Sequence, residues 1–286
     1  MKKIGFLLVL YLVSFNTNSQ SESSEKELLI TFYNATNGDS WKDKWHLEEP
    51  MENWKGVSLE NGHVVRLALP QNNLTGYLPA AIFQLKKLRE LNLFFNRIGG
   101  ELPKNIGDAQ QLQSIDITLN MFTGNIPNGL SELKNLQILS FGMNQFQGVL
   151  PKKIGHLKKL EVLDVNSNYL KGKIACIKWN TMNLKTINLA DNYFEGLLPK
   201  QLGELKKLEQ LNVFKNNFTG NIPKEIFKLE KLRMLNLAYN AFEGVIPFEL
   251  LAMKNLNVLL LNSNKFSNVK QFNELDHSRI VEFEVK

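Results

Sequence analysis

Nine asparagines recur at a strict interval of 24 residues, with no insertion or deletion between the first and the last. An unbroken period of this kind indicates one supersecondary unit copied and stacked into a quasi-one-dimensional solenoid. In such a molecule, function usually lies in the variable surface residues and less often in a catalytic pocket. We call the nine residues the ladder asparagines: Asn72, Asn96, Asn120, Asn144, Asn168, Asn192, Asn216, Asn240 and Asn264.

Each copy begins with a short alternation of apolar and polar residues, as in Leu91-Asn92-Leu93. This period of two predicts a strand. Because one copy cannot bury its apolar side alone, the copies must stack, and we expect their strands to form a parallel sheet. A ladder asparagine stands where the chain leaves each strand, and its amide can satisfy turn groups that the sheet no longer pairs. We therefore assign the ladder asparagines a structural role.

The remainder of each copy predicts a tight turn, a buried spine and an outer helical turn. Glycine follows the ladder asparagine by four positions in eight copies, from Gly76 to Gly244, which suggests a positive φ or a close backbone approach. Proline stands seven positions after it in most copies and stiffens a segment that reads as a helical or 3-10 turn. A large apolar residue, most often phenylalanine, follows it by two positions and predicts an internal spine.

Taken together, these positions give the motif LxxLxLxxNxLxGxLPxxLGxLxx over about residues 64–268. The motif resembles the leucine-rich repeat in its 24-residue variant, typical of plant receptor ectodomains and polygalacturonase-inhibiting proteins and also found in exported bacterial proteins. The resemblance implies an α/β solenoid, a horseshoe of about nine repeats. Its parallel sheet would lie on the concave face and its short helical or 3-10 turns on the convex face. Members of this family usually bind proteins, peptides or glycans and are usually not enzymes.

The two ends of the solenoid need covering. An amphipathic helix starting near Ser24 and three tryptophans, Trp41, Trp45 and Trp54, are similar to the N-terminal cap of the family. Family caps often carry flanking cysteines, but Glu52 and Leu59 stand there, so this cap must hold by packing alone. We expect a cap over residues 21–63, the solenoid over 64–268 and a second cap over 269–286, in which residues 279–285 alternate like a terminal strand.

The first residues have the layout of a secretory signal peptide. Lys2 and Lys3 precede about a dozen mostly apolar residues, and a polar stretch follows. We expect a signal peptide over residues 1–20, the alternative being an uncleaved N-terminal anchor. No later run reaches 18 apolar residues, so we expect no membrane span after its removal. The predicted location is secreted, periplasmic or at the cell surface.

Charge and cysteine content argue against two other classes. The formal charge of +6 falls by two, to +4, without Lys2 and Lys3, and lysine pairs such as Lys86-Lys87 recur with the repeat. With no arginine cluster or aromatic interleaving, these pairs predict a solvated outer face and no nucleic-acid partner. The single Cys176 excludes an intramolecular disulfide, and we expect it to be a small buried residue, the alternative being an intermolecular bridge. It lies in an irregular fifth copy, where Trp179 either forms a convex contact or, as we favour, packs inward.

Residues that point away from the core between and after the strand leucines form the candidate binding surface. Exposed aromatic and apolar side chains with polar neighbours mark interaction surfaces. The alternative is that some of them fold back over the rim of the sheet. Phe94, Phe95, Leu119 and Met143 are consecutive along one edge, Phe214 and Tyr239 form a second apolar spot, and the middle of the strands contributes Asn92, Asp116, Asp164 and Asn188.

Catalysis finds little support in the sequence. The four histidines fall in unrelated places, none has a partner at metal-ligand spacing, and Cys176 has no nearby histidine. Asp116 and Asp164 lie two strands apart, about 9.6 Å, close to the separation of an inverting glycosidase. The family habitually carries Asp or Asn at that position, however. We therefore expect no enzyme, no metal and no cofactor.

The sequence thus predicts an exported, monomeric, non-catalytic recognition protein that binds a protein or peptide on its concave face. The alternative is a secreted or cell-surface polysaccharide-binding protein. In that alternative, Phe94, Phe95 and Tyr239 would serve as stacking platforms, with the Asn/Asp row as hydrogen-bonding partners.

Overall fold

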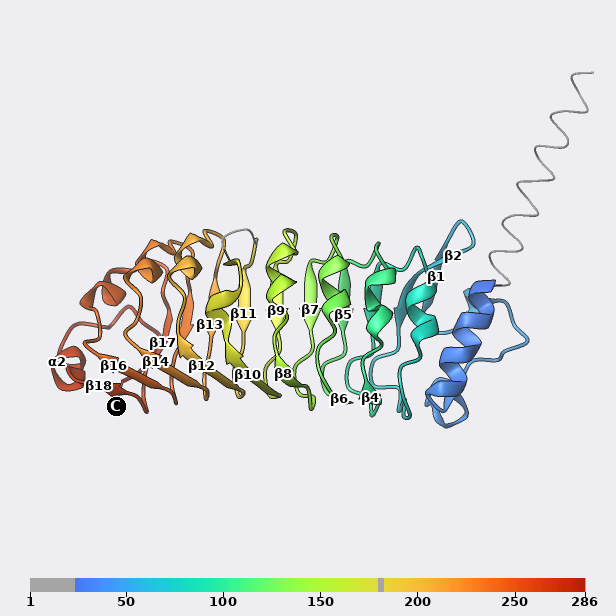
Figure 1. Cartoon of the computed structure of the whole chain (residues 1–286), viewed down its shortest axis with the longest axis horizontal. Coiled ribbons are helices and arrows are strands. Elements are labelled where there is room, and N and C mark those ends of the chain that lie inside the picture. The colour runs from blue at the N-terminus through green and yellow to red at the C-terminus, as the bar shows by residue number, and fades with distance from the viewer. Residues whose placement is uncertain (1–23, 180–182, 286) are drawn as a thin grey trace, which may run out of the picture.

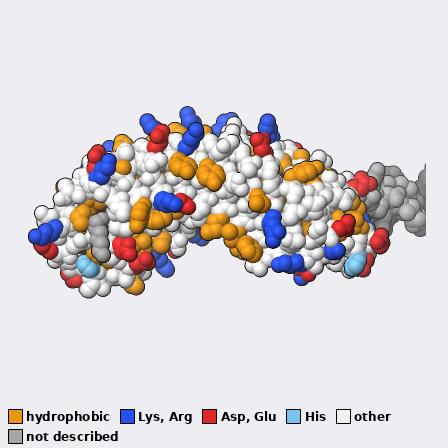
Figure 2. All heavy atoms as spheres, turned by 90° about the horizontal axis from the view of Figure 1, so that it is seen from below, with side chains coloured by type: hydrophobic (Ala, Val, Ile, Leu, Met, Phe, Trp, Pro, Cys, Tyr) orange, Lys and Arg blue, Asp and Glu red, His pale blue; other side chains and the backbone are white. Residues whose placement is uncertain are grey.

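A computed structural model describes residues 24–179 and 183–285. The expected signal peptide, residues 1–20, lies outside the described residues. The chain forms one curved solenoid, with the N-terminal helix (residues 24–35) at one end and α2 (Val269–Asn273) at the other (Figure 1). Seen from below, it is an arc with lysine and arginine side chains along its outer edge (Figure 2). This is the leucine-rich repeat architecture that the sequence predicts.

The main sheet runs along the solenoid from copy to copy. It has eleven strands in the described part of the chain. Its first strand, β1 (Val57–Glu60), pairs antiparallel with β2 (His63–Ala68), and every later pairing is parallel. Within the repeats each residue pairs with the one 24 positions on, as Leu91 does with Ile115. The later strands are β3 (Glu90–Asn92), β5 (Ser114–Asp116), β7 (Ile138–Ser140), β9 (Val162–Asp164), β11 (Thr186–Asn188), β13 (Gln210–Asn212), β15 (Met234–Asn236), β17 (Val258–Leu260) and β19 (Glu282–Glu284).

A second sheet, which the sequence pattern did not predict, follows the ladder asparagines along the lower edge in Figure 1. Its register advances by 22 residues per copy, as in the pairing of Gly172 with Phe194, so its strands are staggered relative to those of the main sheet. The strands are β8 (Gln147–Val149), β10 (Tyr169–Lys173), β12 (Tyr193–Leu197), β14 (Asn217–Gly220), β16 (Ala241–Gly244) and β18 (Lys265–Phe266), and β4 (Gly99–Glu101) pairs with β6 (Met121–Thr123).

Short 3-10 helices form the outer turns, as predicted. In the described repeats, all of these helices except Ile174–Cys176 directly follow a proline, whose fixed φ suits the start of a helical turn. The 3-10 helices of the repeats are Ala80–Gln84, Lys104–Asp108, Asn128–Glu132, Lys152–His156, Ile174–Cys176, Lys200–Glu204, Lys224–Lys228 and Phe248–Ala252, and the N-terminal cap adds Gly38–Ser40 and Met51–Asn53.

The ladder asparagines join neighbouring copies through buried hydrogen bonds. The Nδ2 of Asn144 donates to the carbonyl of Ile117 in the preceding copy at 2.9 Å, and to those of Phe141 and Gly142 at its own turn. Its Oδ1 accepts from the backbone N–H of Phe122, again in the preceding copy, at 3.0 Å. The structural role assigned from the sequence is thus confirmed. Beneath the ladder the phenylalanine spine is fully buried, with Phe122 and Phe146 3° from parallel.

The N-terminal cap holds by aromatic packing and one buried carboxylate. Trp45 stacks on Trp54 with ring centroids 4.7 Å apart and meets Trp41 edge-on at 4.9 Å. Glu25, on the first helix, accepts the backbone N–H of Val64 at 2.6 Å and lies 2.9 Å from Nδ1 of His63. The helix is therefore fixed directly to β2.

The irregular fifth copy corrects one expectation and confirms another. Trp179 is fully buried, and its Nε1 donates to the carbonyl of Ile174 at 3.0 Å, so it packs inward as favoured. The expectation that Cys176 is buried is wrong, because the side chain is exposed and its Sγ lies 3.1 Å from the carbonyl of Lys173. The equivalent position, the first residue of the outer turn, is also exposed in other copies, for example at Lys152 and Lys200.

Candidate binding surface

The polar row along the middle of the concave sheet closes its own turns. Asn92 Oδ1 accepts the backbone N–H of Phe94 at 3.0 Å, and Asp116 Oδ1 accepts that of Thr118 at 2.9 Å. Each of these residues thus uses one acceptor for the scaffold, and the rest of its polar group remains half-buried on the concave face. The same bond to the residue two positions on recurs at Asp164, Asn188, Asn212 and Asn236.

Asp164 is the most constrained carboxylate of that row. Its Oδ1 accepts the backbone N–H of Asn166 at 3.0 Å, and its Oδ2 accepts Nδ2 of Asn188 at 3.0 Å. Burial raises the pKa of Asp164 above its ordinary value, and the charge of Asp116 raises it further, against the opposing effect of the two hydrogen bonds. A cation bound between the two aspartates would relieve this penalty.

The first apolar spot lies on the turns that end β3, β5 and β7. Phe94 and Phe95 are in contact, with ring centroids 6.1 Å apart, and Phe95 is 52% exposed. Leu119 is half-buried and Met143 is exposed. Phe95, Leu119 and Met143 all have left-handed backbone conformations, with φ of 54°, 58° and 52°. They stand at the rim where the chain turns toward the second sheet.

The second apolar spot consists of Phe214 and Tyr239. Their rings meet edge-on with centroids 5.2 Å apart, and Tyr239 is 52% exposed. Five copies separate Phe94 from Phe214, which corresponds to about 24 Å at one strand spacing per copy. The structure therefore brings the sequence-predicted residues together as two aromatic spots with an acidic middle, rather than as one patch.

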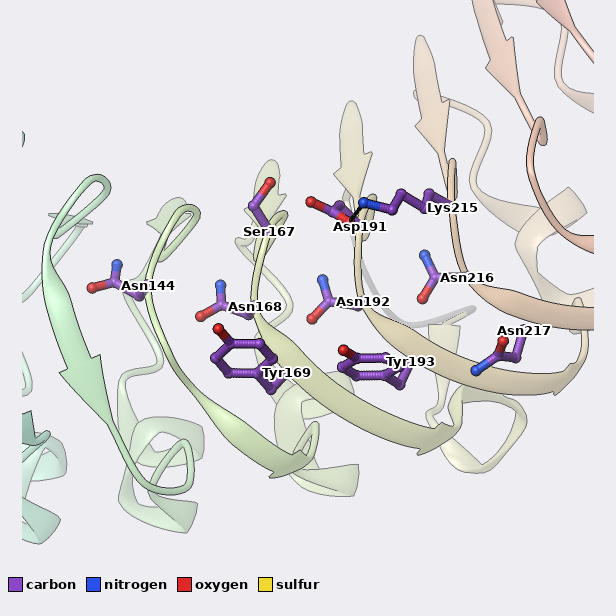
Figure 3. A pocket seen from close by; sticks show the side chains of 10 residues that line it. All are labelled: Asn144, Ser167, Asn168, Tyr169, Asp191, Asn192, Tyr193, Lys215, Asn216 and Asn217. Carbon is purple, nitrogen blue, oxygen red and sulfur yellow. Dashed lines mark ion pairs between the residues drawn. The ribbon is translucent and has the colours of Figure 1, made fainter.

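A third feature, which the sequence-based site does not include, extends from the rim across the ladder to the second sheet. Tyr169 and Tyr193 line a pocket of about 480 Å³ together with Ser167, Asp191, Lys215, Asn217 and four ladder asparagines (Figure 3). The signal that could have found it is the occurrence of tyrosine in two successive copies directly after the ladder asparagine.

Two structural observations bear on the class of protein. In residues 24–179 and 183–285, no group of three or more His, Cys, Asp or Glu side chains is arranged to hold a metal ion. Within the same ranges, no helix has the length and hydrophobicity that a membrane span requires.

Comparison with known proteins agrees with this geometry. Models of the leucine-rich repeat match residues 84–101, 183–205 and 207–229. The chain is a leucine-rich repeat protein of the plant type. Over 109 residues it is 31% identical to a probable inactive receptor kinase of Arabidopsis thaliana. The aligned region covers 37% of this chain but only 16% of that kinase.

Solved structures share most of the solenoid. The ectodomain of the Arabidopsis receptor kinase HAESA, in complex with the peptide hormone IDA and the co-receptor SERK1, superposes with a TM-score of 0.76 at 29% identity. That match covers 84% of this leucine-rich repeat protein and 42% of the HAESA chain. A plant ice-binding protein matches with a TM-score of 0.74 over 85% of this chain and 80% of its own, but at 21% identity it shares the fold alone.

Proposed function

We propose that this leucine-rich repeat protein is an exported, non-catalytic recognition protein that binds an extended peptide, or an extended segment of a protein, along its concave face. The observation that carries the proposal is the pair of aromatic spots, Phe94/Phe95 and Phe214/Tyr239, on the turns that end strands of one continuous sheet. Clustered aromatic side chains of this kind supply most of the binding energy at protein interfaces.

The spacing of the spots suggests the length and charge of the ligand. An extended peptide advances about 3.3 Å per residue, so about seven or eight residues would bridge the two spots. Between them lie Asp116 and Asp164, and burial, with a smaller contribution from the charge of Asp116, raises the pKa of Asp164. We therefore expect a ligand with two apolar anchors near its ends and a lysine or arginine between them.

The solved structure of HAESA with a peptide hormone supports this class of ligand. That support concerns the solenoid only, because this chain spans less than half of the HAESA chain and an even smaller share of the curated relatives. The geometry also favours a non-catalytic role. Both oxygens of Asp164 accept hydrogen bonds from the scaffold, and an acceptor of Asp116 is used in the same way. Asp164 is therefore not placed as a free acid or base.

Selection of a displayed library of random twelve-residue peptides on the purified protein tests the proposal. We expect enriched peptides with two apolar residues about seven positions apart and a basic residue between them. Substitution of Phe95→Ala together with Tyr239→Ala should weaken the selected peptides by about tenfold or more, measured by calorimetry.

The matched control is Phe248→Ala, which removes an equally exposed ring, 52%, from a convex 3-10 helix and should leave peptide binding unchanged. The proposal fails if no peptide is enriched, or if the enriched peptides bind the double variant as tightly as the unaltered protein.

A further inference from the structure

The outer face of the second sheet carries two tyrosines side by side. In each copy one residue follows the ladder asparagine directly, and only in two neighbouring copies is it aromatic. Tyr169 and Tyr193 are 53% and 54% exposed, their ring centroids are 6.3 Å apart and their planes differ by 16°. Figure 3 shows the two rings with nearly the same tilt, alongside the row of ladder amides. We call this pair the tyrosine platform.

The tyrosine platform stands on the most extended part of the second sheet. Its strands, β10 and β12, have five residues each, whereas the other strands of that sheet have two to four. The two strands pair directly, and ladder bonds from Asn168 and Asn192 fix the turns from which they start. The platform is thus rigid before any ligand arrives, which reduces the entropy lost on binding.

The surroundings of the platform are polar and carry little net charge. In the pocket, Lys215 Nζ lies 2.7 Å from Asp191 Oδ1, so these two charges neutralise each other. Asn217 contributes an exposed carboxamide at the end of the ring pair. Within residues 24–179 and 183–285, neither tyrosine hydroxyl makes a hydrogen bond to another side chain or to the backbone. These groups are therefore available to a ligand.

We propose that the tyrosine platform binds a neutral saccharide, with the C–H face of a sugar ring on the aromatic rings and its hydroxyls on Asn217, Asp191 and the phenols. Stacking on flat π-faces combined with a few fixed polar groups suits a ligand that is apolar on its faces and polar at its edges. The internal Asp191–Lys215 ion pair leaves no excess charge to select an acidic sugar.

The arrangement suits a saccharide better than a protein surface. Apolar side chains do lie on the same sheet, at Val149 and Leu197, both exposed. Lys171 and Glu195, however, stand two positions beyond the tyrosines on the same face of their strands and separate the rings from those side chains. The tyrosines are therefore not part of a continuous apolar patch of the kind that protein partners cover. The tyrosines lie on the second sheet, whereas Asp191 and Lys215 of the pocket stand at the rim position that Met143 and Tyr239 occupy in other copies.

Calorimetric titration with hexamers of β-1,4-linked glucose, mannose and galactose tests the proposal. We expect at least one hexamer to bind, and Tyr169→Ala with Tyr193→Ala to lower its association constant about tenfold or more. Tyr169→Phe with Tyr193→Phe should keep most of the affinity, because the stacking faces remain. Asn217→Ala, which leaves both rings in place, should weaken binding by a smaller factor.

Tyr77→Ala is the matched control, because it removes a 59% exposed tyrosine from a site outside the pocket and should not change saccharide binding. Phe95→Ala with Tyr239→Ala should also leave it unchanged, which separates this proposal from the concave one. The unfolding midpoint of each variant shows that the fold is intact. Absence of binding for all three hexamers, or equal binding by the double alanine variant, would overturn the proposal. If no saccharide binds and the double alanine variant instead loses binding of a selected peptide, the platform is a peptide site, and the saccharide proposal is overturned as well.

Discussion

Asparagine and aspartate do two different jobs at the single-residue scale in each copy. The ladder asparagine bonds the backbone of its own turn and of the preceding copy, whereas an asparagine or aspartate at the middle of the strand accepts the backbone N–H two positions ahead. Only an amide can do the first job, because it needs donors and an acceptor together. The second job needs an acceptor only, which is why Asp116 and Asp164 can replace asparagine there. An aspartate at such a half-buried position adds a charge that the scaffold does not need.

Substitution of Asp164→Asn should therefore stabilise the protein more at neutral than at acid pH. Burial raises the pKa of Asp164, so the folded protein binds this proton more tightly than the unfolded chain. The stabilising contribution of Asp164 is then greatest at low pH and falls as pH rises through the raised pKa. The variant does not titrate, so its free energy of unfolding relative to the unaltered protein should increase from about pH 3 to about pH 7.

Urea unfolding at several pH values measures that difference, and Asp276→Asn provides a control of opposite sign. The pKa of Asp276 is lowered, chiefly by the backbone N–H of Ser278 at 3.0 Å. Its contribution to stability is present at neutral pH and is lost as pH falls, so this variant should become relatively less stable as pH rises. A pH-independent difference for Asp164→Asn would contradict the assignment.

At the element scale, the turn after each ladder asparagine shows why parts of the fold were predictable and others were not. Buried positions such as Leu91 and Phe122 repeat faithfully, because a stacked core tolerates little change, and the sequence predicts them. The second sheet is formed by residues whose outward side chains vary, as Tyr169 and Lys171 do, and its 22-residue register is hidden beneath the 24-residue period. For the same reason, the pattern of the concave face does not predict the tyrosine platform.

The glycines of these turns are expected to differ in importance. Gly76 has a φ of +80°, and a Cβ added there would lie 2.3 Å from the carbonyl oxygen of Ala35 in the first helix. Gly100 has a similar φ of +75°, but its added Cβ would meet nothing closer than Cβ of Tyr77, at 3.6 Å. Gly100→Ala should therefore cost only the strain of a left-handed alanine, about 1–2 kcal/mol. Gly76→Ala should cost at least about 1 kcal/mol more, because it also separates the cap from the solenoid.

Chemical unfolding of the two glycine variants measures this difference directly. The comparison is well matched, because the residue change and the backbone conformation are the same and only the neighbouring atoms differ. Equal destabilisation would show that the first helix does not depend on its contact with the first turn. A larger loss at Gly100 would contradict the packing described here.

On the scale of the whole molecule, the solenoid has a regular spacing, because each copy adds the same length. Every copy contacts mainly its neighbours, through identical ladder bonds and an unbroken main sheet. The distance between any two surface features is therefore set by the number of copies between them. The sequence predicts this regular spacing almost completely, because the period has no gaps. It predicts much less well which positions along it bind a ligand, because the variable residues follow no rule.

Duplication of one copy tests whether the two aromatic spots act together. Repeating residues 144–167 directly after residue 167 preserves each ladder bond and moves the spots apart by about 4.8 Å, more than one residue of an extended peptide. A peptide that needs both spots should then lose about tenfold or more in affinity, approaching the binding of a single spot. The control repeats residues 240–263 after residue 263, which lengthens the solenoid equally but leaves the spots at their original separation.

Because both insertions add one buried copy between existing ones, both proteins should unfold at or above the original midpoint. If the first insertion leaves peptide affinity intact, the two spots bind separately, and the proposal that one peptide bridges them is wrong. If the control also loses affinity, the ligand extends beyond Tyr239 toward the C-terminal cap.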